Sequence, residues 1–263
     1  MVNKFGEQGG FENILSMMKT SLSFEQFCVL NDIMNCTHSF LHYHFAKDFL
    51  GNFIKFELDY LLDISLLDKR NFKRDKVDKI IKNIQDMLFK VYFETDVNSF
   101  MDNFGIEFGS NCIKSPMLDK QIFGLKIITD TLSKINRINT CSTVSLANEK
   151  HIPLQVLLSK ILSFNILDLI LNAHNEIIKN AGDLIKILLS NKSLTIEDVE
   201  KIWLSAQKAD PDKKTILYKI LQLNSSSFPY DLAKEFLQKL LKLPEDKLNT
   251  FDLEVKLLNY LFM

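Results

Sequence analysis

Glycine and proline are scarce in this chain, which has 8 glycines and 5 prolines among its 263 residues. Flexible interdomain linkers are rich in such residues, so the sequence offers few places where a linker could lie. With 46% apolar and 25% charged residues, the composition is that of a folded protein and not of a disordered segment. We therefore expect one continuous domain over residues 1–263.

An excess of charge of either sign is also lacking. The 32 basic and 33 acidic side chains leave a formal net charge of −1, too little to attract a nucleic acid or an anionic membrane. The N-terminus has an early acid, Glu7, and no basic segment followed by an apolar one, so no secretory signal is predicted. The most apolar stretch, 154–173, is interrupted by Lys160, Asn165 and Asp168, which disfavours a membrane span. We predict a cytoplasmic protein.

Cysteine is rare and unpaired in sequence. The four cysteines are widely spaced and form no CxxC motif: Cys28, Cys36, Cys112 and Cys141. This spacing argues against a disulfide framework and against a zinc knuckle. We expect reduced thiols that are mostly buried.

Apolar residues recur at helical spacing along most of the chain, and no convincing run of strict alternation occurs. One stripe runs through Val77, Ile80, Ile81, Ile84, Met87, Leu88 and Val91. Further stripes contain Ile177, Ala181, Leu184 and Leu188; Ile196, Val199, Trp203 and Ala206; Ile216, Ile220 and Leu223; Leu232, Phe236 and Leu240; and Phe251, Val255, Leu258 and Phe262. Each stripe predicts an amphipathic helix, and strands are expected to be absent or trivial.

Helix-start signals agree with these stripes. Thr195 with Asp198 forms a capping-box-like pair, and Asp210 before Pro211 places an N-cap ahead of a proline at the first helical position. Ser115 before Pro116 predicts a similar start for a helix that runs to about Arg137.

The predicted starts near 175, 195, 211, 229 and 250 are about twenty residues apart, so two helices make a unit near forty. The sequence therefore predicts an all-α fold, an armadillo- or HEAT-like α-solenoid of helix pairs, with a globular helical bundle as the alternative. The last predicted helix ends on Leu257, Leu258, Leu261 and Phe262 without a polar capping repeat. We expect this segment to belong to a longer array, or a partner to cover its end.

Few residues suggest chemistry. His38 and His42 are four residues apart and would share a helical face, with Cys36 and His44 nearby, but the carboxylate of an HExxH motif is missing. Gly105 and Gly109 lack the lysine or third glycine of a phosphate-binding loop. We expect no metal, no cofactor and no catalytic residue, and we interpret Trp203 as a core side chain.

Three segments, in order along the chain, resemble one family. Asn3-Lys4-Phe5-Gly6 with Gly10-Phe11 opens the series, and Leu125-Lys126-Ile127-Ile128 lies in its middle. The third is Asn165-Ile166-Leu167 followed by Leu194-Thr195-Ile196-Glu197-Asp198-Val199-Glu200-Lys201-Ile202-Trp203 and Ala206-Gln207. These segments are similar to the helical region that precedes the protease domain of fat-facets-type ubiquitin-specific proteases. The link after the tryptophan, 208–214, departs from the family pattern.

The resemblance implies a non-catalytic, armadillo-like scaffold segment of a deubiquitinase homologue, which positions ubiquitinated substrates, other protein partners or the protease domain. Asn139-Thr140-Cys141-Ser142 echoes the nucleophile segment of these enzymes, but Ile138 replaces its glycine and Ser142 its aromatic residue. Without a nearby base the thiol would not be activated, so we expect a polar loop over 139–150. The alternative function is an independent helical-repeat adaptor unrelated to ubiquitin. A helical enzyme that uses His38 and His42 is the third hypothesis.

Overall fold

The computed structural model describes residues 1–20, 22–42, 46–63, 73–140 and 152–240, and none of them lies in a β-strand. The first half contains α1 (Val2–Glu7), α2 (Gly10–Met18), α3 (Phe24–Thr37), η1 (His38–Phe40), η2 (Ala46–Leu50), α5 (Gly51–Leu62), α6 (Arg74–Val91) and α7 (Glu94–Lys114). The second half contains α8 (Leu118–Thr140), α9 (Leu154–Ser163), α10 (Ile166–Leu171), α11 (Asn175–Asn180), α12 (Gly182–Ser190), α13 (Ile196–Lys208), α14 (Pro211–Leu223), η4 (Ser225–Ser227) and α15 (Tyr230–Leu240). The chain is all-α over these residues, as the sequence predicts.

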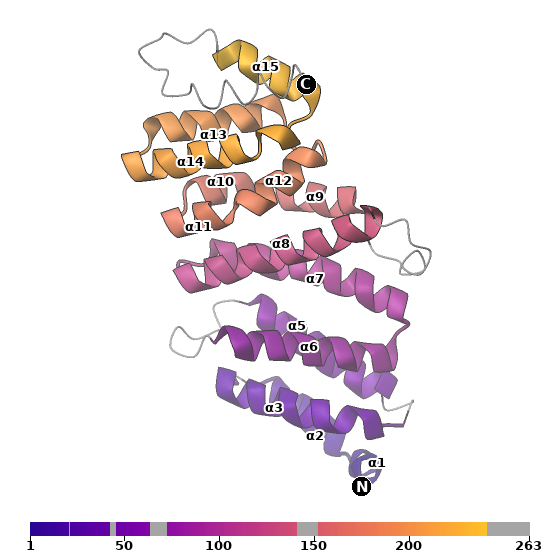
Figure 1. Ribbon diagram of the computed structural model, residues 1–263. Helices are drawn as coiled ribbons and strands as arrows, with labels where there is room; N and C mark the ends of the chain where they lie inside the picture. The colour runs from indigo at the N-terminus through magenta and orange to yellow at the C-terminus, as the bar shows by residue number, and fades with distance from the viewer. Residues whose placement is uncertain (21, 43–45, 64–72, 141–151, 241–263) are drawn as a thin grey trace.

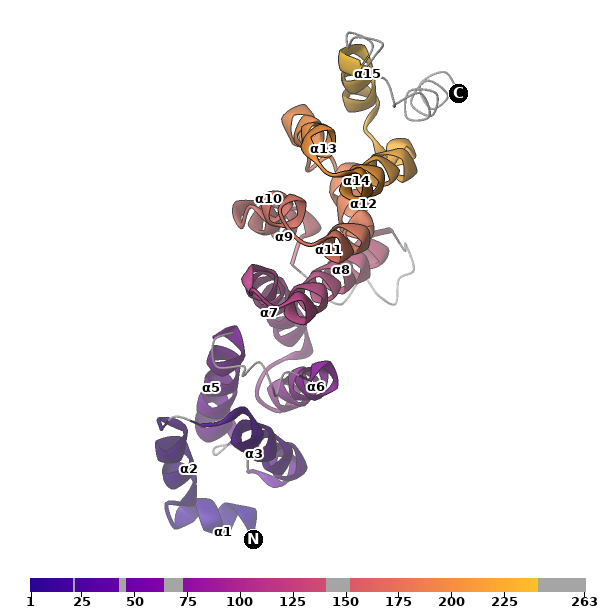
Figure 2. The same cartoon turned by 90° about the vertical axis from the view of Figure 1, so that its left-hand side faces the viewer.

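The helices stack in chain order, with α1 at one end of the molecule and α15 at the other (Figure 1). Seen from the side, they form two layers (Figure 2). One layer contains α2, α5, α7, α9, α10 and α13, and the other contains α3, α6, α8, α11, α12 and α14. The closest contacts join elements near in sequence, such as α3 with α6, α7 with α8, and α13 with α14. Each helix is therefore stabilised mainly by its immediate neighbours.

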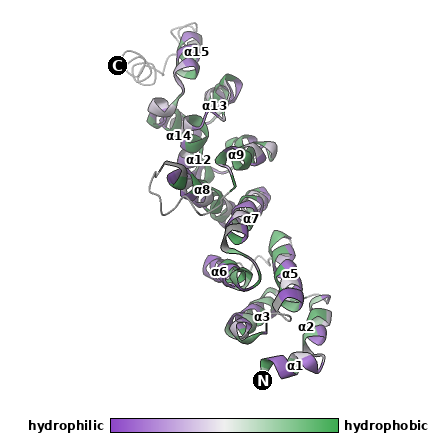
Figure 3. Cartoon of the chain, turned by 90° about the vertical axis from the view of Figure 1, so that its right-hand side faces the viewer, coloured by the Kyte–Doolittle hydropathy of each residue, from purple (hydrophilic) through white to green (hydrophobic). Residues whose placement is uncertain are grey.

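Buried apolar side chains form two clusters along this stack. The N-terminal core runs from α2 to α8 and is rich in aromatic rings, such as the stacked Phe27 and Tyr60 with centroids 4.1 Å apart. The C-terminal core runs from α7 to α15 and consists mostly of leucine and isoleucine. Figure 3 shows the hydrophobic residues on the inward faces of the two layers. Helices α7 and α8 contribute to both cores: Phe108 belongs to the N-terminal core, whereas Ile106 belongs to the C-terminal core.

Two glycines allow α7 and α8 to cross in close contact. A Cβ atom on Gly109 would lie 2.7 Å from the carbonyl oxygen of Gly124, and a Cβ atom on Gly124 would meet the backbone of Gly109 and lie 2.5 Å from the Cβ atom of Cys112. Real Cβ atoms do not approach other atoms so closely. Both positions therefore need glycine for the packing of the two helices.

The predicted helix starts in the second half are largely confirmed. Thr195 accepts a hydrogen bond from the backbone N–H of Asp198, whose carboxylate accepts from the N–H of Thr195, so the capping box is complete. Asp210 accepts from the N–H of Lys213 ahead of Pro211. Trp203 is 5% exposed and packs in the C-terminal core, as predicted.

Four local predictions are wrong. Ser115 caps the C-terminus of α7 and does not start the next helix: its hydroxyl accepts from the N–H of Met117, and α8 begins at Leu118, two residues after Pro116. The stripe from Ile177 to Leu188 is divided between α11 and α12 at Ala181, just before Gly182, a residue that favours kinks. Leu223, predicted to belong to the apolar face of its helix, is 63% exposed at the end of α14. Cys36, predicted to be buried with most of the thiols, is exposed.

The apolar stretch 154–173 is divided by Asn165, whose φ of 54° ends α9 and begins α10. In the parts of the chain that the structure describes, no helix combines the length and the apolar character that a membrane span requires. The last predicted helix, with Leu257, Leu258, Leu261 and Phe262, lies outside the described residues. Of the loop predicted over 139–150, residues 139 and 140 are the last two of α8, so the prediction is wrong there, and the rest, with Cys141, lies outside the described residues.

Candidate protein-binding groove

The two histidines predicted to share a helical face do not do so. Helix α3 ends at Thr37, so His38 begins the short turn η1 and His42 follows it. The Nδ1 atom of His38 lies 2.8 Å from the carbonyl oxygen of Asn35, and the backbone N–H of His42 donates to Oδ1 of Asn3 at 2.9 Å. Within the described residues, no three His, Cys, Asp or Glu side chains are grouped closely enough to hold a metal ion, and His44 lies outside them.

Two of the described thiols, on Cys28 and Cys112, are poorly suited to nucleophilic chemistry, whereas Cys36 is exposed. Cys112 is fully buried in α7, and burial raises the pKa of its thiol to about 12, although Lys120 lowers it slightly. Burial likewise raises the pKa of Cys28. A thiol is a nucleophile only as the thiolate, so these two cysteines are unreactive at neutral pH. Gly105 and Gly109 lie inside α7 and form no phosphate-binding loop.

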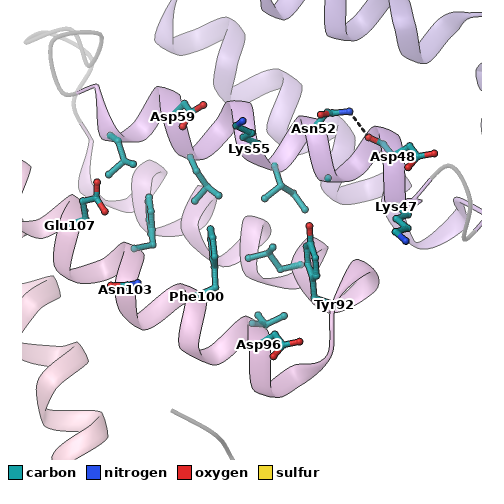
Figure 4. A pocket seen from close by; sticks show the side chains of 17 residues that line it. Lys47, Asp48, Asn52, Lys55, Asp59, Tyr92, Asp96, Phe100, Asn103 and Glu107 are labelled. Atoms are coloured by element: carbon teal, nitrogen blue, oxygen red, sulfur yellow. Dashed lines mark hydrogen bonds between the residues drawn. The ribbon is translucent and has the colours of Figure 1, made fainter. Parts of the chain in front are cut away.

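A groove of about 850 Å3 lies between α5 and α7, which are neighbours in the same layer (Figure 4). Its base consists of apolar side chains, most of them buried: Ile54, Leu58, Leu62, Leu88, Val97 and Phe104. Apolar side chains of α5 and α7 pack in the N-terminal core, and some of them also line the groove between the two helices. No helix of the described residues fills the space between them on this side, so the groove is open there.

The two rims of the groove carry side chains at the same helical spacing, all of them polar except Phe100. The rim of η2 and α5 presents Asp48, Asn52, Lys55 and Asp59, and the rim of α7 presents Asp96, Phe100, Asn103 and Glu107. Both sets follow the intervals four, three and four, which place side chains on one face of a helix. Figure 4 shows that the rims run in the same direction, with Asp48 and Asp96 toward the end where Tyr92 lies and Asp59 and Glu107 toward the opposite end.

The charges of the groove are predominantly negative. Four carboxylates and two lysines, Lys47 and Lys55, line it. Glu107 forms an ion pair with Lys160 of α9 at 3.4 Å, and Lys160 also donates to Oδ1 of Asn103 at 2.8 Å. The other three carboxylates, on Asp48, Asp59 and Asp96, are exposed and form no ion pair within the described part of the chain. They are free to meet an incoming cation.

Two aromatic rings in the groove are exposed. Phe100 is 45% exposed and Tyr92 is 51% exposed, and both point into the groove (Figure 4). Large rings that remain wet in the free protein are the side chains that most often contribute binding energy at protein interfaces. An apolar base, two exposed rings and a polar rim together match the anatomy of a site for a peptide segment.

Behind the groove, the opposite face of α5 carries a buried carboxyl group. Glu57 is fully buried, and its Oε1 accepts a hydrogen bond of 2.8 Å from Nδ2 of Asn31 on α3. Oδ1 of Asn31 in turn accepts a bond of 2.6 Å from Nδ2 of Asn83 on α6. The second oxygen, Oε2, has no hydrogen-bond partner among the described residues. Burial raises the pKa of Glu57 to about 8, against the opposing effect of the bond from Asn31, so the carboxyl is mostly protonated at pH 7.

A second, smaller surface lies at the α1 end of the stack. Side chains of α2, α3 and the segment between them form an apolar depression of about 360 Å3, lined by Ile14, Met17, Leu22, Glu25, Gln26, Val29, Leu30 and Ile33. Met17, Val29 and Ile33 are each more than half exposed. This surface has almost no polar rim, so it lacks the features that would select a particular ligand.

Sequence reasoning did not predict the groove. The matched spacing of the two rims is visible in the sequence, at 48, 52, 55 and 59 and at 96, 100, 103 and 107, and could have drawn attention to these positions. That the two faces oppose each other depends on the stacking of α5 on α7, which the sequence does not reveal. In comparisons with protein-family models, curated proteins and solved structures, no match to this chain is found.

Proposed function

We propose that this chain is a non-catalytic helical scaffold that binds protein partners, with the α5–α7 groove as a binding site. The observation that carries the proposal is the open groove itself, which holds exposed Phe100 and Tyr92 between two polar rims. Exposed rings beside an apolar base and polar rims form a surface suited to a protein partner. Among the described residues, the Cys112 thiol is buried and no three His, Cys, Asp or Glu side chains are grouped to hold a metal ion, which favours a non-catalytic role.

We further propose that the stack is an armadillo- or HEAT-like solenoid of helix pairs. Its support is the succession of two-layer pairs, α5 with α6, α7 with α8 and α13 with α14, in which the two members contact each other. Solenoids of this kind expose long surfaces between repeats, and the groove lies between two consecutive pairs. The cytoplasm is the proposed compartment, in keeping with the unpaired thiols.

The resemblance to fat-facets-type ubiquitin-specific proteases suggests a more specific function, which is a scaffold segment that positions ubiquitinated substrates, a partner protein or a protease domain. Its support is the ordered set of three sequence segments. The longest segment lies on α13. There Thr195 caps the helix and Trp203 is buried, so both residues also have a structural role in this chain. An adaptor unrelated to ubiquitin would use the groove in the same way.

The binding function is tested by selection from a phage-displayed library of random peptides on the immobilised full chain. Phe100→Ala removes an exposed ring from the groove, and Phe40→Ala removes one that is 68% exposed in η1, outside the groove. We expect selected peptides to bind the wild type and Phe40→Ala equally and to bind Phe100→Ala at least about tenfold more weakly. A library that yields no peptide sensitive to Phe100 would contradict the proposed site.

The absence of protease activity is tested with ubiquitin that carries a fluorophore at its C-terminus. We expect no release of the fluorophore above blank by the wild type or by Cys141→Ala, because no base or glycine-rich approach accompanies this thiol in the sequence. Turnover by the wild type that disappears in Cys141→Ala would overturn the non-catalytic interpretation.

A further inference from the structure

We propose that the α5–α7 groove binds a short, extended peptide that carries one basic side chain near each end and an apolar side chain between them. This inference rests on the proposed binding function and specifies the ligand. It follows from three properties of the groove: the position of its carboxylates, the position of its rings, and the hydrogen-bonding groups on its rims.

The carboxylates lie toward the two ends of the groove and not at its centre. Asp48 and Asp96 lie toward one end, and Asp59 and Glu107 toward the other (Figure 4). Asp96 and Glu107 are eleven residues apart on the same helix, which corresponds to about 16 Å at 1.5 Å per residue. An extended chain rises about 3.3 Å per residue, so two basic residues five positions apart would reach both ends. The carboxylates therefore specify the spacing of the basic residues as well as their charge.

The middle of the groove is suited to an apolar side chain. Phe100 lies between Asp96 and Asn103 on one rim, and the base beneath it is formed by buried residues such as Leu58 and Val97. An aliphatic or aromatic side chain placed here would cover the exposed part of the Phe100 ring and remove apolar surface from water on both sides. This contact would supply most of the affinity, and the end charges would supply orientation and specificity.

The polar groups between the carboxylates favour an extended ligand over a helix. The amide nitrogen of Asn52 donates to the carbonyl oxygen of Asp48, which leaves its oxygen to accept from a ligand, and the oxygen of Asn103 accepts from Lys160, which leaves its amide N–H groups to donate. Lys55 offers three further donors. An extended backbone has free N–H and C=O groups that can bond to these side chains, whereas the backbone groups of a helix are bonded within the helix. A helix would also need its basic residues eleven positions apart to reach both ends.

The two ends of the groove should not contribute equally. Glu107 already pairs with Lys160, which also donates to Asn103, so a ligand cation there shares its carboxylate with a lysine. The end with Asp48 and Asp96 has no such competing pair within the described residues, although the exposed Lys47 is adjacent in sequence. The basic residue at this end of the peptide should therefore matter more.

The test uses fluorescein-labelled peptides and fluorescence anisotropy with the full chain. The designed peptide has arginines at positions 1 and 6, leucine at position 4 and serine or alanine elsewhere, with blocked termini. The matched controls have the same composition with the arginines at positions 1 and 2, or glutamates in place of both arginines. A fourth peptide is a stapled helix with arginines eleven positions apart and leucines facing the groove.

We expect the designed peptide to bind at least about tenfold more tightly than the two extended controls and more tightly than the helix. Asp96→Asn should weaken binding by about two- to fivefold, as expected for one exposed ion pair, and should reduce its salt dependence. Asp212→Asn, an exposed acid on α14 outside the groove, should leave binding unchanged. Circular dichroism of the variants would show that both remain folded.

The outcomes separate this inference from the proposed function. If library-selected peptides depend on Phe100 but lack paired basic residues, or if the stapled helix binds best, the ligand chemistry proposed here is wrong and the groove remains a binding site. Equal binding of the designed peptide and its glutamate control would also refute the inference. If neither library nor designed peptides respond to Phe100→Ala, both proposals fail.

Discussion

The buried carboxyl of Glu57 should make the protein less stable as the pH rises from about 5 to 8. Its pKa is about 8 in the folded chain, because burial disfavours the charged form, and its ordinary value is 4.5. The folded state thus binds a proton that the unfolded state has lost between these two values. Stability from this group is fully present below pH 4.5 and is lost as the pH rises through the folded pKa.

The size of the effect follows from the difference between the two pKa values. At about 1.4 kcal/mol per pKa unit, the full loss above pH 8 is about 5 kcal/mol, and the loss at pH 7 is about 3 kcal/mol. Glu57→Gln keeps the shape of the protonated side chain, can still accept the bond from Asn31, and cannot ionise. We therefore expect the variant to be about 3 kcal/mol more stable than the wild type at pH 7 and only about 1 kcal/mol more stable at pH 5.

The assay must follow the N-terminal core, where Glu57 lies. The single tryptophan, Trp203, belongs to the C-terminal core, so its fluorescence would follow the wrong half of the stack. Urea unfolding observed by amide hydrogen exchange in α3, α5 and α6, at pH 5, 6, 7 and 8, would measure the free energy of opening where the change is made. Subtracting the free energy of opening of the wild type from that of the variant at each pH cancels the contribution of all other titrating groups. A difference that stays constant or shrinks as the pH rises would refute the reasoning.

Two pairs of substitutions test the packing of the helices and the capping box. Gly124→Ala should destabilise the chain by about 1–3 kcal/mol in urea unfolding, because the new Cβ atom would meet the backbone of α7. The control is Gly182→Ala: Gly182 has open space around it, so this change should be neutral or should stabilise the chain by up to about 1 kcal/mol. Equal effects of the two changes would contradict the close helix crossing. Thr195→Ala should lower the free energy of unfolding by about 1 kcal/mol, measured in urea by the fluorescence of Trp203 on the same helix, and Thr195→Ser should keep most of the wild-type stability. An unchanged urea midpoint in Thr195→Ala would show that the capping box contributes nothing to stability.

The sequence predicted best those helices that are amphipathic and begin with a recognisable cap. Helix α6 matches its stripe from Val77 to Leu88, and α13 and α14 begin at their predicted caps. These elements follow from local chemistry, since one face is apolar and the first free N–H groups need an acceptor nearby. The division at Ala181 was missed because the apolar stripe continues through it, with Ile177 and Leu184 buried on either side.

The groove could not be predicted for a different reason. Its two rims are more than thirty residues apart in sequence, and each rim alone resembles an ordinary solvated helix face. The site exists because α5 and α7 are neighbours in one layer while α6 lies in the other (Figure 2). Glu57 was missed as well, since a charged residue within a helix is usually exposed, and its burial depends on amide partners on two other helices.

The pair formed by α7 and α8 determines how this protein can be divided into fragments. One face of the pair completes the N-terminal core and the other completes the C-terminal core. A fragment that stops before Glu94 would expose the apolar residues that pack against Phe104 and Phe108, and a fragment that begins after Thr140 would expose those that pack against Ile128 and Leu132. The minimal folded pieces therefore overlap: either half is expected to be well behaved only when it carries its own copy of residues 94–140.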